Sequence, residues 1–334
     1  MNGGGMRGLA AAAMLTLVAL LLAATPAAMH VSPARAGAVG IDPRALYSRI
    51  HFVGASASAG FGVRPPLPRD HPRRLQEVSL ARIAACARLG QGEVTGDATG
   101  LFFLNPVGTG RTQVDGVLGA KERPSLVVAA DFLFWFTYGA ADAQRQPIKD
   151  EKQRLAMLEV GLAEMDRLVQ AGVPLVLGDI PDMSPAVGRM LSKAQMPALA
   201  TLDAANARIQ EWASSRPRVA VLPLSRLIGQ LRSGKPFDAG RRSWSEEVDG
   251  PLLQRDQLHP TFNGEVALLA RIEQAANERF LGATQPNAPG APTVFEQDPR
   301  RVSEILRERI DPPPTASPAA PPAGASPRRS STAR

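Results

Sequence analysis

The sequence predicts an α/β fold, a three-layer αβα sandwich on a mostly parallel central sheet. Short apolar segments rich in branched and aromatic residues alternate with longer stretches whose apolar residues recur every three or four positions. This alternation occupies roughly residues 45–282, a length that suits one large domain. Because strands separated by helices join through right-handed crossovers, we expect a parallel sheet covered on both faces.

The predicted strands are short apolar runs bounded by proline, glycine or polar residues. They cover residues 49–53, 101–104, 125–130, 173–178 and 218–222. The helical periodicity falls between and after them, over residues 75–89, 149–171, 199–214 and 262–280. Ligands of such sheets bind beyond the carboxyl ends of the strands, so the residues that follow each strand are the candidates for chemistry.

The composition excludes several classes of protein. A single cysteine, Cys86, excludes an intramolecular disulfide framework and a zinc site built on several thiolates. The four histidines are scattered, so no metal centre is predicted. The net charge is +7, but the two ends carry much of it, and residues 37–310 keep only +3. This mild charge does not indicate a nucleic-acid partner.

Residues 1–36 have the layout of a secretory signal peptide. Arg7 precedes an apolar run over residues 9–24, which is shorter than the roughly 20 residues that span a bilayer. Small residues at Ala34 and Ala36 offer a cleavage site. An uncleaved N-terminal anchor is the alternative. Either interpretation predicts an exported domain, periplasmic or secreted.

The other end of the chain changes in composition. We expect the α/β domain to occupy residues 37–284, followed by a linker with one short amphipathic helix over residues 285–310. Residues 311–334 are rich in Pro, Ala and Ser and predict a disordered basic tail. Arg328 and Arg329 suggest transient contact with anionic envelope material, and a merely solvated tail is the alternative.

A run of small residues, 54–60, follows the first strand and carries the hydroxyls of Ser56 and Ser58. A hydroxyl at this turn would be exposed at the sheet edge, and a following helix would direct its N-terminal N–H groups toward an oxyanion. Runs of this kind are mostly plain turns. The segment alone therefore leaves the nucleophile open.

Asp256 and His259 lie three residues apart, directly before the last helix. On one tight turn the carboxylate can accept the Nδ1–H bond of the imidazole, which leaves Nε2 free to take a proton. A helix cap and a surface histidine are the alternative interpretation. With Ser56 at the other end of the domain, the pattern of a nucleophile, a base and an orienting carboxylate is complete.

These segments resemble the sequence blocks of the SGNH (GDSL-type) hydrolases. Residues 54–60 are similar to the block Gly-Asp-Ser-Leu-Ser-x-Gly, and residues 256–260 resemble the closing Asp-x-x-His block. Residues 109–112 resemble the second block of the family. The resemblance covers roughly residues 48–280 and implies a flavodoxin-like αβα sandwich.

The resemblance implies a serine esterase that cleaves acyl or acetyl esters of lipids or glycans through a covalent acyl-enzyme. Ser56 would be the nucleophile, His259 the general base and then acid, and Asp256 the residue that orients His259. The N–H groups of Ser56 and Gly110 would form the oxyanion hole. No cofactor is implied.

The sequence departs from the family pattern in two places. Ala55 replaces the aspartate of the first block. Where Gly-x-Asn-Asp would follow the third predicted strand, the chain has residues 131–139, and Phe134 falls near the position of the oxyanion asparagine. The loss of one such donor costs about 3 kcal/mol of transition-state stabilisation. The substitute donors left open are Trp135, Thr137 and Asn105.

Residues 132–138 hold five aromatic side chains, which either pack in the core or form an aromatic wall beside Ser56. From these aromatic residues, Phe134 and Trp135 are candidate substrate-pocket residues. Asn105, one of the possible substitute donors, is the third candidate. Two other functions remain open. The missing asparagine favours a binding or scaffold protein with weakened catalysis, and a glycan O-acyltransferase would use the same three catalytic residues.

Overall fold

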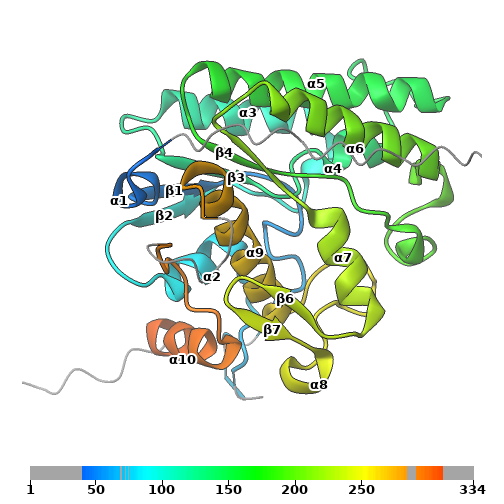
Figure 1. Ribbon diagram of the computed structural model, residues 1–334. Helices are drawn as coiled ribbons and strands as arrows, with labels where there is room; N and C mark the ends of the chain where they lie inside the picture. The colour runs from blue at the N-terminus through cyan, green and yellow to red at the C-terminus, as the bar shows by residue number, and fades with distance from the viewer. Residues whose placement is uncertain (1–39, 68–69, 72, 74, 284–290, 311–334) are drawn as a thin grey trace, which may run out of the picture. The chain divides into compact units, whose positions relative to one another are not determined.

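The computed structural model describes residues 40–67, 70–71, 73, 75–283 and 291–310, and its centre is a five-stranded sheet (Figure 1). The strand order is β2-β1-β3-β4-β5, and all neighbouring strands are parallel. The predicted fold class, an α/β sandwich on a parallel sheet, is confirmed. The strands are β1 (Arg49–Phe52), β2 (Glu93–Gly96), β3 (Leu126–Ala129), β4 (Leu175–Gly178) and β5 (Val219–Leu222).

Helices cover both faces of the sheet. One face carries α3 (Pro106–Gly119), α5 (Glu151–Gln170) and α6 (Leu199–Ser214), and the other carries α2 (Leu80–Ala87) and α9 (Phe262–Phe280) (Figure 1). The shorter elements are α1 (Pro43–Leu46), η1 (Phe102–Leu104), α4 (Phe134–Tyr138), η2 (Ser184–Ala186), η3 (Lys193–Gln195), α7 (Leu224–Ser233), β6 (Phe237–Ala239), β7 (Arg242–Trp244) and α8 (Glu246–Asp249).

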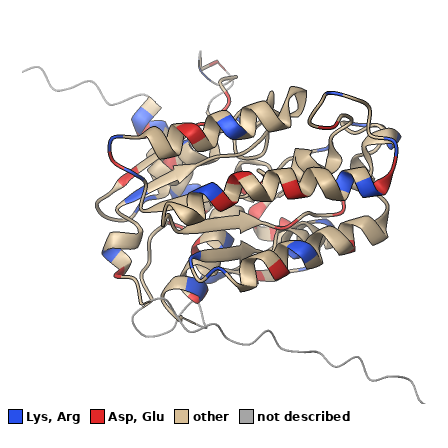
Figure 2. Ribbon diagram, turned by 90° about the horizontal axis from the view of Figure 1, so that it is seen from above, with Lys and Arg blue, Asp and Glu red and all other residues tan. Residues whose placement is uncertain are grey.

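Local chemistry explains where the long helices start. The Asp150 side chain accepts the N–H of Gln153 and caps α5, and Thr261 caps α9 in the same way by accepting the N–H of Gly264. Every residue of β3 and of β4 is buried, which accounts for their uninterrupted apolar runs. On the outer helices, basic and acidic residues are interspersed (Figure 2), as in the ion pair between Arg208 and Glu159.

The second predicted strand is wrong. Residues 101–104 do not join the sheet, because Phe102–Leu104 form the short 3-10 helix η1. The true second strand, β2, lies at the sheet edge, pairs only with β1, and reads Glu-Val-Thr-Gly. A half-exposed edge strand needs no apolar run, so the hydrophobic pattern gave no signal for it.

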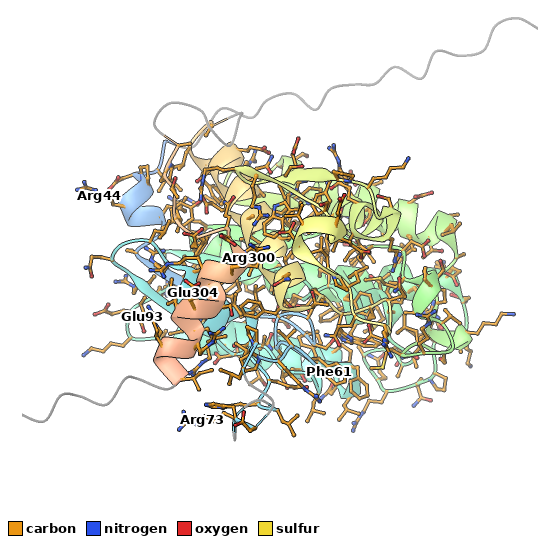
Figure 3. The ribbon with its side chains drawn as sticks, turned by 90° about the horizontal axis from the view of Figure 1, so that it is seen from below. Arg44, Phe61, Arg73, Glu93, Arg300 and Glu304 are labelled. Atoms are coloured by element: carbon orange, nitrogen blue, oxygen red, sulfur yellow. The ribbon has the colours of Figure 1, made fainter. Side chains whose placement is uncertain are left out.

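The short helix predicted within residues 285–310 is present, but it packs against the domain and is not part of a free linker. Helix α10 (Pro299–Ile310) packs against α2 and α9 through the buried side chains of Val302, Leu306 and Ile310. Arg300 and Glu304 lie on its exposed side (Figure 3). Residues 291–310 therefore belong to the packed domain, because an amphipathic helix of this kind is stabilised by burying its apolar face.

The remaining terminal predictions fall outside the described residues. These are the signal peptide over residues 1–36, the start of the linker at residues 285–290, and the tail over residues 311–334. Among the helices of the described residues, none has both the length and the apolar character that a membrane span requires.

Candidate active site

Ser56 lies on the tight turn that follows β1, at the carboxyl edge of the sheet. Gly54 opens this turn with a φ of +148°, and a Cβ atom there would lie 2.2 Å from Asp131 Oδ1. Only glycine suits this position. The helix predicted over residues 75–89 is shorter in the structure and starts at Leu80, as α2. It therefore does not follow the turn directly. The turn is instead closed by backbone hydrogen bonds, such as that from Phe61 N–H to the Ser56 carbonyl.

The carboxylate of Asp131 holds the nucleophile turn from the end of β3. It accepts the N–H of Ala55 at 2.9 Å, the N–H of Ala57 at 2.8 Å and the N–H of Ser58 at 3.2 Å. It also accepts the Ser58 hydroxyl at 2.6 Å. Asp131 therefore takes the N–H groups on both sides of Ser56, while the N–H of Ser56 donates to no acceptor in the described part of the chain. The Ser56 N–H is therefore available to donate a hydrogen bond to a ligand.

Gln113 of α3 fixes the start of the same turn. Its Oε1 accepts the N–H of Gly54 at 3.0 Å, and its Nε2 donates to the carbonyls of Gly54 at 3.0 Å and Asp97 at 2.9 Å. The loop after β2 is tied in as well, because Thr99 N–H donates to the Gly54 carbonyl at 3.1 Å. In this loop the N–H of Gly100 has no acceptor among the described residues. A Cβ atom built on Gly100 would lie 3.9 Å from Phe61 Cδ2.

The turn that carries His259 is built around Asp256. One carboxylate oxygen, Oδ1, accepts the N–H of Leu258 at 2.9 Å and that of His259 at 3.0 Å. The other, Oδ2, lies 2.8 Å from His259 Nδ1. Burial would raise the pKa of the Asp256 carboxyl, but the hydrogen bonds from the His259 ring, His259 N–H and Leu258 N–H together lower it. Asp256 is thus held as a carboxylate.

Three groups fix the position of the histidine turn. Gln254 Nε2 donates to the carbonyls of Phe61 at 2.7 Å and Pro260 at 2.8 Å, and so joins the histidine turn to the loop after Ser56. Arg232 of α7 donates to the carbonyl of Gln257 at 3.0 Å. The ring of Phe61 lies 4.7 Å from the His259 ring, centre to centre.

The structure brings Ser56, His259 and Asp256 together. His259 Nε2 lies 2.9 Å from Ser56 Oγ, and His259 is 2% exposed. With Nδ1 donating to Asp256, Nε2 is free to accept the serine proton. This continuous hydrogen-bonded chain is the arrangement that activates a serine hydroxyl for nucleophilic attack.

Gly110 is not placed where the resemblance implied. It is the fifth residue of α3, so its N–H lies within the hydrogen-bonding ladder of the helix. A Cβ atom at Gly110 would lie 2.9 Å from Phe132 Cζ and 3.2 Å from Phe136 Cζ. The glycine therefore serves close packing between α3 and the core. In the loop after β2, which is tied to the nucleophile turn, the N–H of Gly100 has no acceptor among the residues that the structure describes.

Of the three predicted pocket residues, Phe134 lines a cavity at the candidate site, and the other two do not. Phe134 lines an apolar cavity together with Ser56 and His259. Trp135 and Asn105 do not line that cavity. Trp135 is buried against Phe134 and its indole N–H has no partner among the described residues, and Asn105 caps α3 by accepting the N–H of Gly108. Of the other aromatic side chains, Phe132, Phe136 and Tyr138 are fully buried in the core.

A second buried acid lies behind the nucleophile turn. Glu265 of α9 is completely buried, and neither of its carboxyl oxygens has a hydrogen-bond partner in the described residues. Burial, and then the charge of Asp131, raise the pKa of the Glu265 carboxyl well above its usual range. Burial therefore favours the neutral form of Glu265, while the hydrogen-bond donors of the turn converge on Asp131.

Sequence reasoning did not find the roles of Asp131, Gln113 and Gln254. In the sequence, Asp131 is only a carboxylate that follows a predicted buried strand. Its partners lie 73 to 76 residues away, and those of Gln113 in the turn lie 59 residues away. No local pattern reports such contacts. Within the described residues (40–67, 70–71, 73, 75–283 and 291–310), no three His, Cys, Asp or Glu side chains gather in a way that could hold a metal ion.

No protein-family model and no curated protein matches this sequence. Among solved structures, a Bacteroides fragilis protein with a proposed acylhydrolase activity is similar, at 16% identity and a TM-score of 0.41 over 70% of this chain and 88% of that one. A gut microbial diltiazem-metabolizing enzyme has 12% identity and a TM-score of 0.40 over 71% and 48% of the two chains. A Parabacteroides merdae protein with a proposed GDSL-like lipase activity has 8% identity and a TM-score of 0.39 over 72% and 99%. At these identities and TM-scores the similarities carry no functional argument, and the description of the site rests on the topology and the side-chain contacts.

Proposed function

We propose that this protein is a serine hydrolase that cleaves carboxylic esters. The observation that carries the proposal is the hydrogen-bonded chain from Asp256 through His259 to Ser56, with contacts of 2.8 Å and 2.9 Å. The partners come from opposite ends of the domain, and they meet at the carboxyl edge of the sheet, where ligands of such folds bind.

The proposed reaction follows from these contacts. Ser56 Oγ attacks the ester carbonyl carbon while its proton passes to His259 Nε2. The tetrahedral oxyanion accepts hydrogen bonds from the N–H of Ser56 and the N–H of Gly100. His259 then gives the proton to the departing alcohol, which leaves the acyl group on Ser56. Water, deprotonated by His259, attacks this acyl-enzyme and releases the acid.

The oxyanion hole in this proposal has no side-chain amide, because Phe134 occupies the cavity wall beside Ser56. The lack of a third donor corresponds to about 3 kcal/mol, or a hundred- to thousandfold in rate. We therefore propose a modest esterase rather than an inactive scaffold. The same residues would serve acyl transfer to a glycan, and that reaction differs only in the acceptor.

The decisive test is active-site labelling. The purified domain is incubated with a fluorophosphonate probe and with p-nitrophenyl acetate, beside Ser56→Ala and the matched control Ser58→Ala. Labelling at Ser56, and hydrolysis that is lost in Ser56→Ala but measurable in Ser58→Ala, would support the proposal. An unlabelled, folded protein that hydrolyses no better than Ser56→Ala would favour the scaffold.

Export is a further part of the proposal. It rests on Arg7 and the apolar run over residues 9–24. Expression of the whole chain in a bacterial host, followed by cell fractionation and N-terminal sequencing, tests it. A protein found outside the cytoplasm, with its N-terminus near residue 37, would support a cleaved signal peptide. A protein found in the membrane fraction, with Arg7 still part of its N-terminal sequence, would support the anchor.

A further inference from the structure

An apolar cavity lies directly against the proposed catalytic pair. Its volume is about 40 Å³, and Ser56 and His259 are among the residues that line it. Its lining comes from the residues that follow β3 and β4 and from helices α7 and α9. The apolar side chains that line it include Phe134, Pro181, Met183, Leu224, Ile228 and Leu268.

The lining determines the chemistry of an occupant. Apart from Ser56 and His259, its one polar side chain is Asp131, whose carboxylate already accepts the donors of the nucleophile turn. A hydroxyl or charged group pushed into this cavity would lose its water and gain no partner, which is costly. An alkyl group loses nothing polar and gains burial. The cavity therefore suits hydrocarbon and excludes a sugar ring.

The size of the cavity limits the length of that alkyl group. A space of about 10–15 Å³ holds one water molecule, so the cavity has room for about three or four non-hydrogen atoms.

The wall of the cavity is fixed by contacts on the far side of Phe134. Phe134 stacks on Tyr138 at 4.3 Å, and the Tyr138 hydroxyl donates to the Pro181 carbonyl at 2.7 Å and accepts the Met183 N–H at 3.0 Å.

The loops next to the nucleophile turn expose apolar side chains at the surface. Phe61 (Figure 3), which contacts His259, is 38% exposed. Leu101 and Phe103 are more exposed still. A substrate with a small acyl group and a larger alcohol would thus place the acyl group inside and leave the alcohol outside.

We propose that this cavity is the acyl pocket and that it restricts the protein to esters of short unbranched acids, from acetyl to butyryl. The inference rests on the proposed esterase function and adds a substrate class to it. The acyl-enzyme would carry its short chain toward Ile228 and Leu268, while the carbonyl oxygen faces the N–H groups of Ser56 and Gly100.

The test is a chain-length series. We would measure kcat/KM of the purified protein with p-nitrophenyl acetate, butyrate, hexanoate and octanoate. The expected result is a maximum between acetate and butyrate and at least a hundredfold lower value for octanoate. Ile228→Ala and Leu268→Ala, which lengthen the pocket, should raise the ratio of octanoate to acetate about tenfold or more.

Ile209→Ala is the matched control. Ile209 of α6 is as deeply buried as Ile228 but does not line the pocket, so this variant loses the same atoms without lengthening it. Thermal unfolding verifies that each variant folds. If Ile228→Ala does not fold, the milder Ile228→Val takes its place.

The outcomes separate the two proposals. A wild-type protein that is labelled at Ser56 but hydrolyses octanoate as well as acetate would overturn the acyl pocket and leave the esterase intact. The same ratio of octanoate to acetate in Ile228→Ala and Ile209→Ala would also overturn it. Absence of both labelling and hydrolysis would instead overturn the esterase.

Discussion

The two halves of the proposed site are held in place by different means. His259 is oriented locally, by a carboxylate three residues earlier on the same turn. Ser56 is positioned from far along the chain, by Asp131 from the end of β3 and Gln113 from α3. The difference shows that the base is supplied by a short sequence motif, whereas the nucleophile needs the assembled sheet. Each half should therefore fail in its own way when it is altered.

The largest effect is expected on the histidine half. Asp256→Asn keeps an oxygen that accepts backbone N–H groups but no longer fixes the Nδ1–H tautomer of His259. We expect kcat to fall by about 10⁴-fold with little loss of stability. The measurement is kcat with p-nitrophenyl acetate, alongside urea unfolding. Asp238→Asn, at an exposed position of β6, is the control, and a fall below tenfold would mean that Asp256 does not orient the base.

Asp131→Asn should damage the nucleophile half in both activity and stability. The amide places donors against N–H groups that now lose their charged acceptor. We expect a loss of about 3 kcal/mol in the free energy of unfolding and a fall in kcat of about 10²-fold. Denaturant unfolding and the labelling rate at Ser56 measure the two effects. The control is Asp182→Asn, an exposed aspartate after β4. If only kcat changed, Asp131 would not be the support of the turn.

Gln254 joins the two halves, so its removal should separate their effects. Gln254→Ala removes the bonds to the Phe61 and Pro260 carbonyls and lets the two loops move apart. We expect kcat to fall about tenfold with KM nearly unchanged, since small displacements of a base are costly. Gln91→Ala, an exposed glutamine before β2, is the comparison. An equal fall in kcat for both variants would show that Gln254 has no special role.

The smallest effect on activity is expected from Glu265→Gln, which mimics the neutral acid. Because the pKa of Glu265 is raised in the folded state, the folded protein binds more protons than the unfolded chain above about pH 4.5. The wild-type free energy of unfolding should therefore fall as pH rises, and this contribution disappears in the variant. From pH 5 to pH 8 the stability of Glu265→Gln relative to wild type should grow, by at most about 1.4 kcal/mol per pH unit.

The exposed Glu278 of α9 gives the control variant, Glu278→Gln. Parallel curves of stability against pH for wild type and Glu265→Gln would contradict a neutral Glu265.

The sequence predicted what local patterns encode. The periodic helices at 199–214 and 262–280 match α6 and α9, because both have long apolar faces and α9 begins at a capping threonine. The edge strand β2 and the α7 helix were not predicted. A polar edge strand has no apolar run, and α7 is short and follows directly on β5.

The same division applies to the site. The spacing of Asp256 and His259 indicated a shared turn, and the structure has that turn. The placement of Gly110 in the oxyanion hole relied on family resemblance and not on local geometry, and the structure puts Gly110 inside α3. The roles of Asp131, Gln113 and Gln254 depend on which loops meet in space. A single sequence does not state which loops will meet.

The distance along the chain between the serine and its base has a consequence for biogenesis. Ser56 leaves the ribosome 203 residues before His259, and α9, which follows His259, packs against β4 and β5. An unfinished polypeptide thus has a serine with no proton acceptor. The proposed hydrolytic activity would therefore arise only once synthesis has passed α9, so an unfinished chain would leave the esters around it intact.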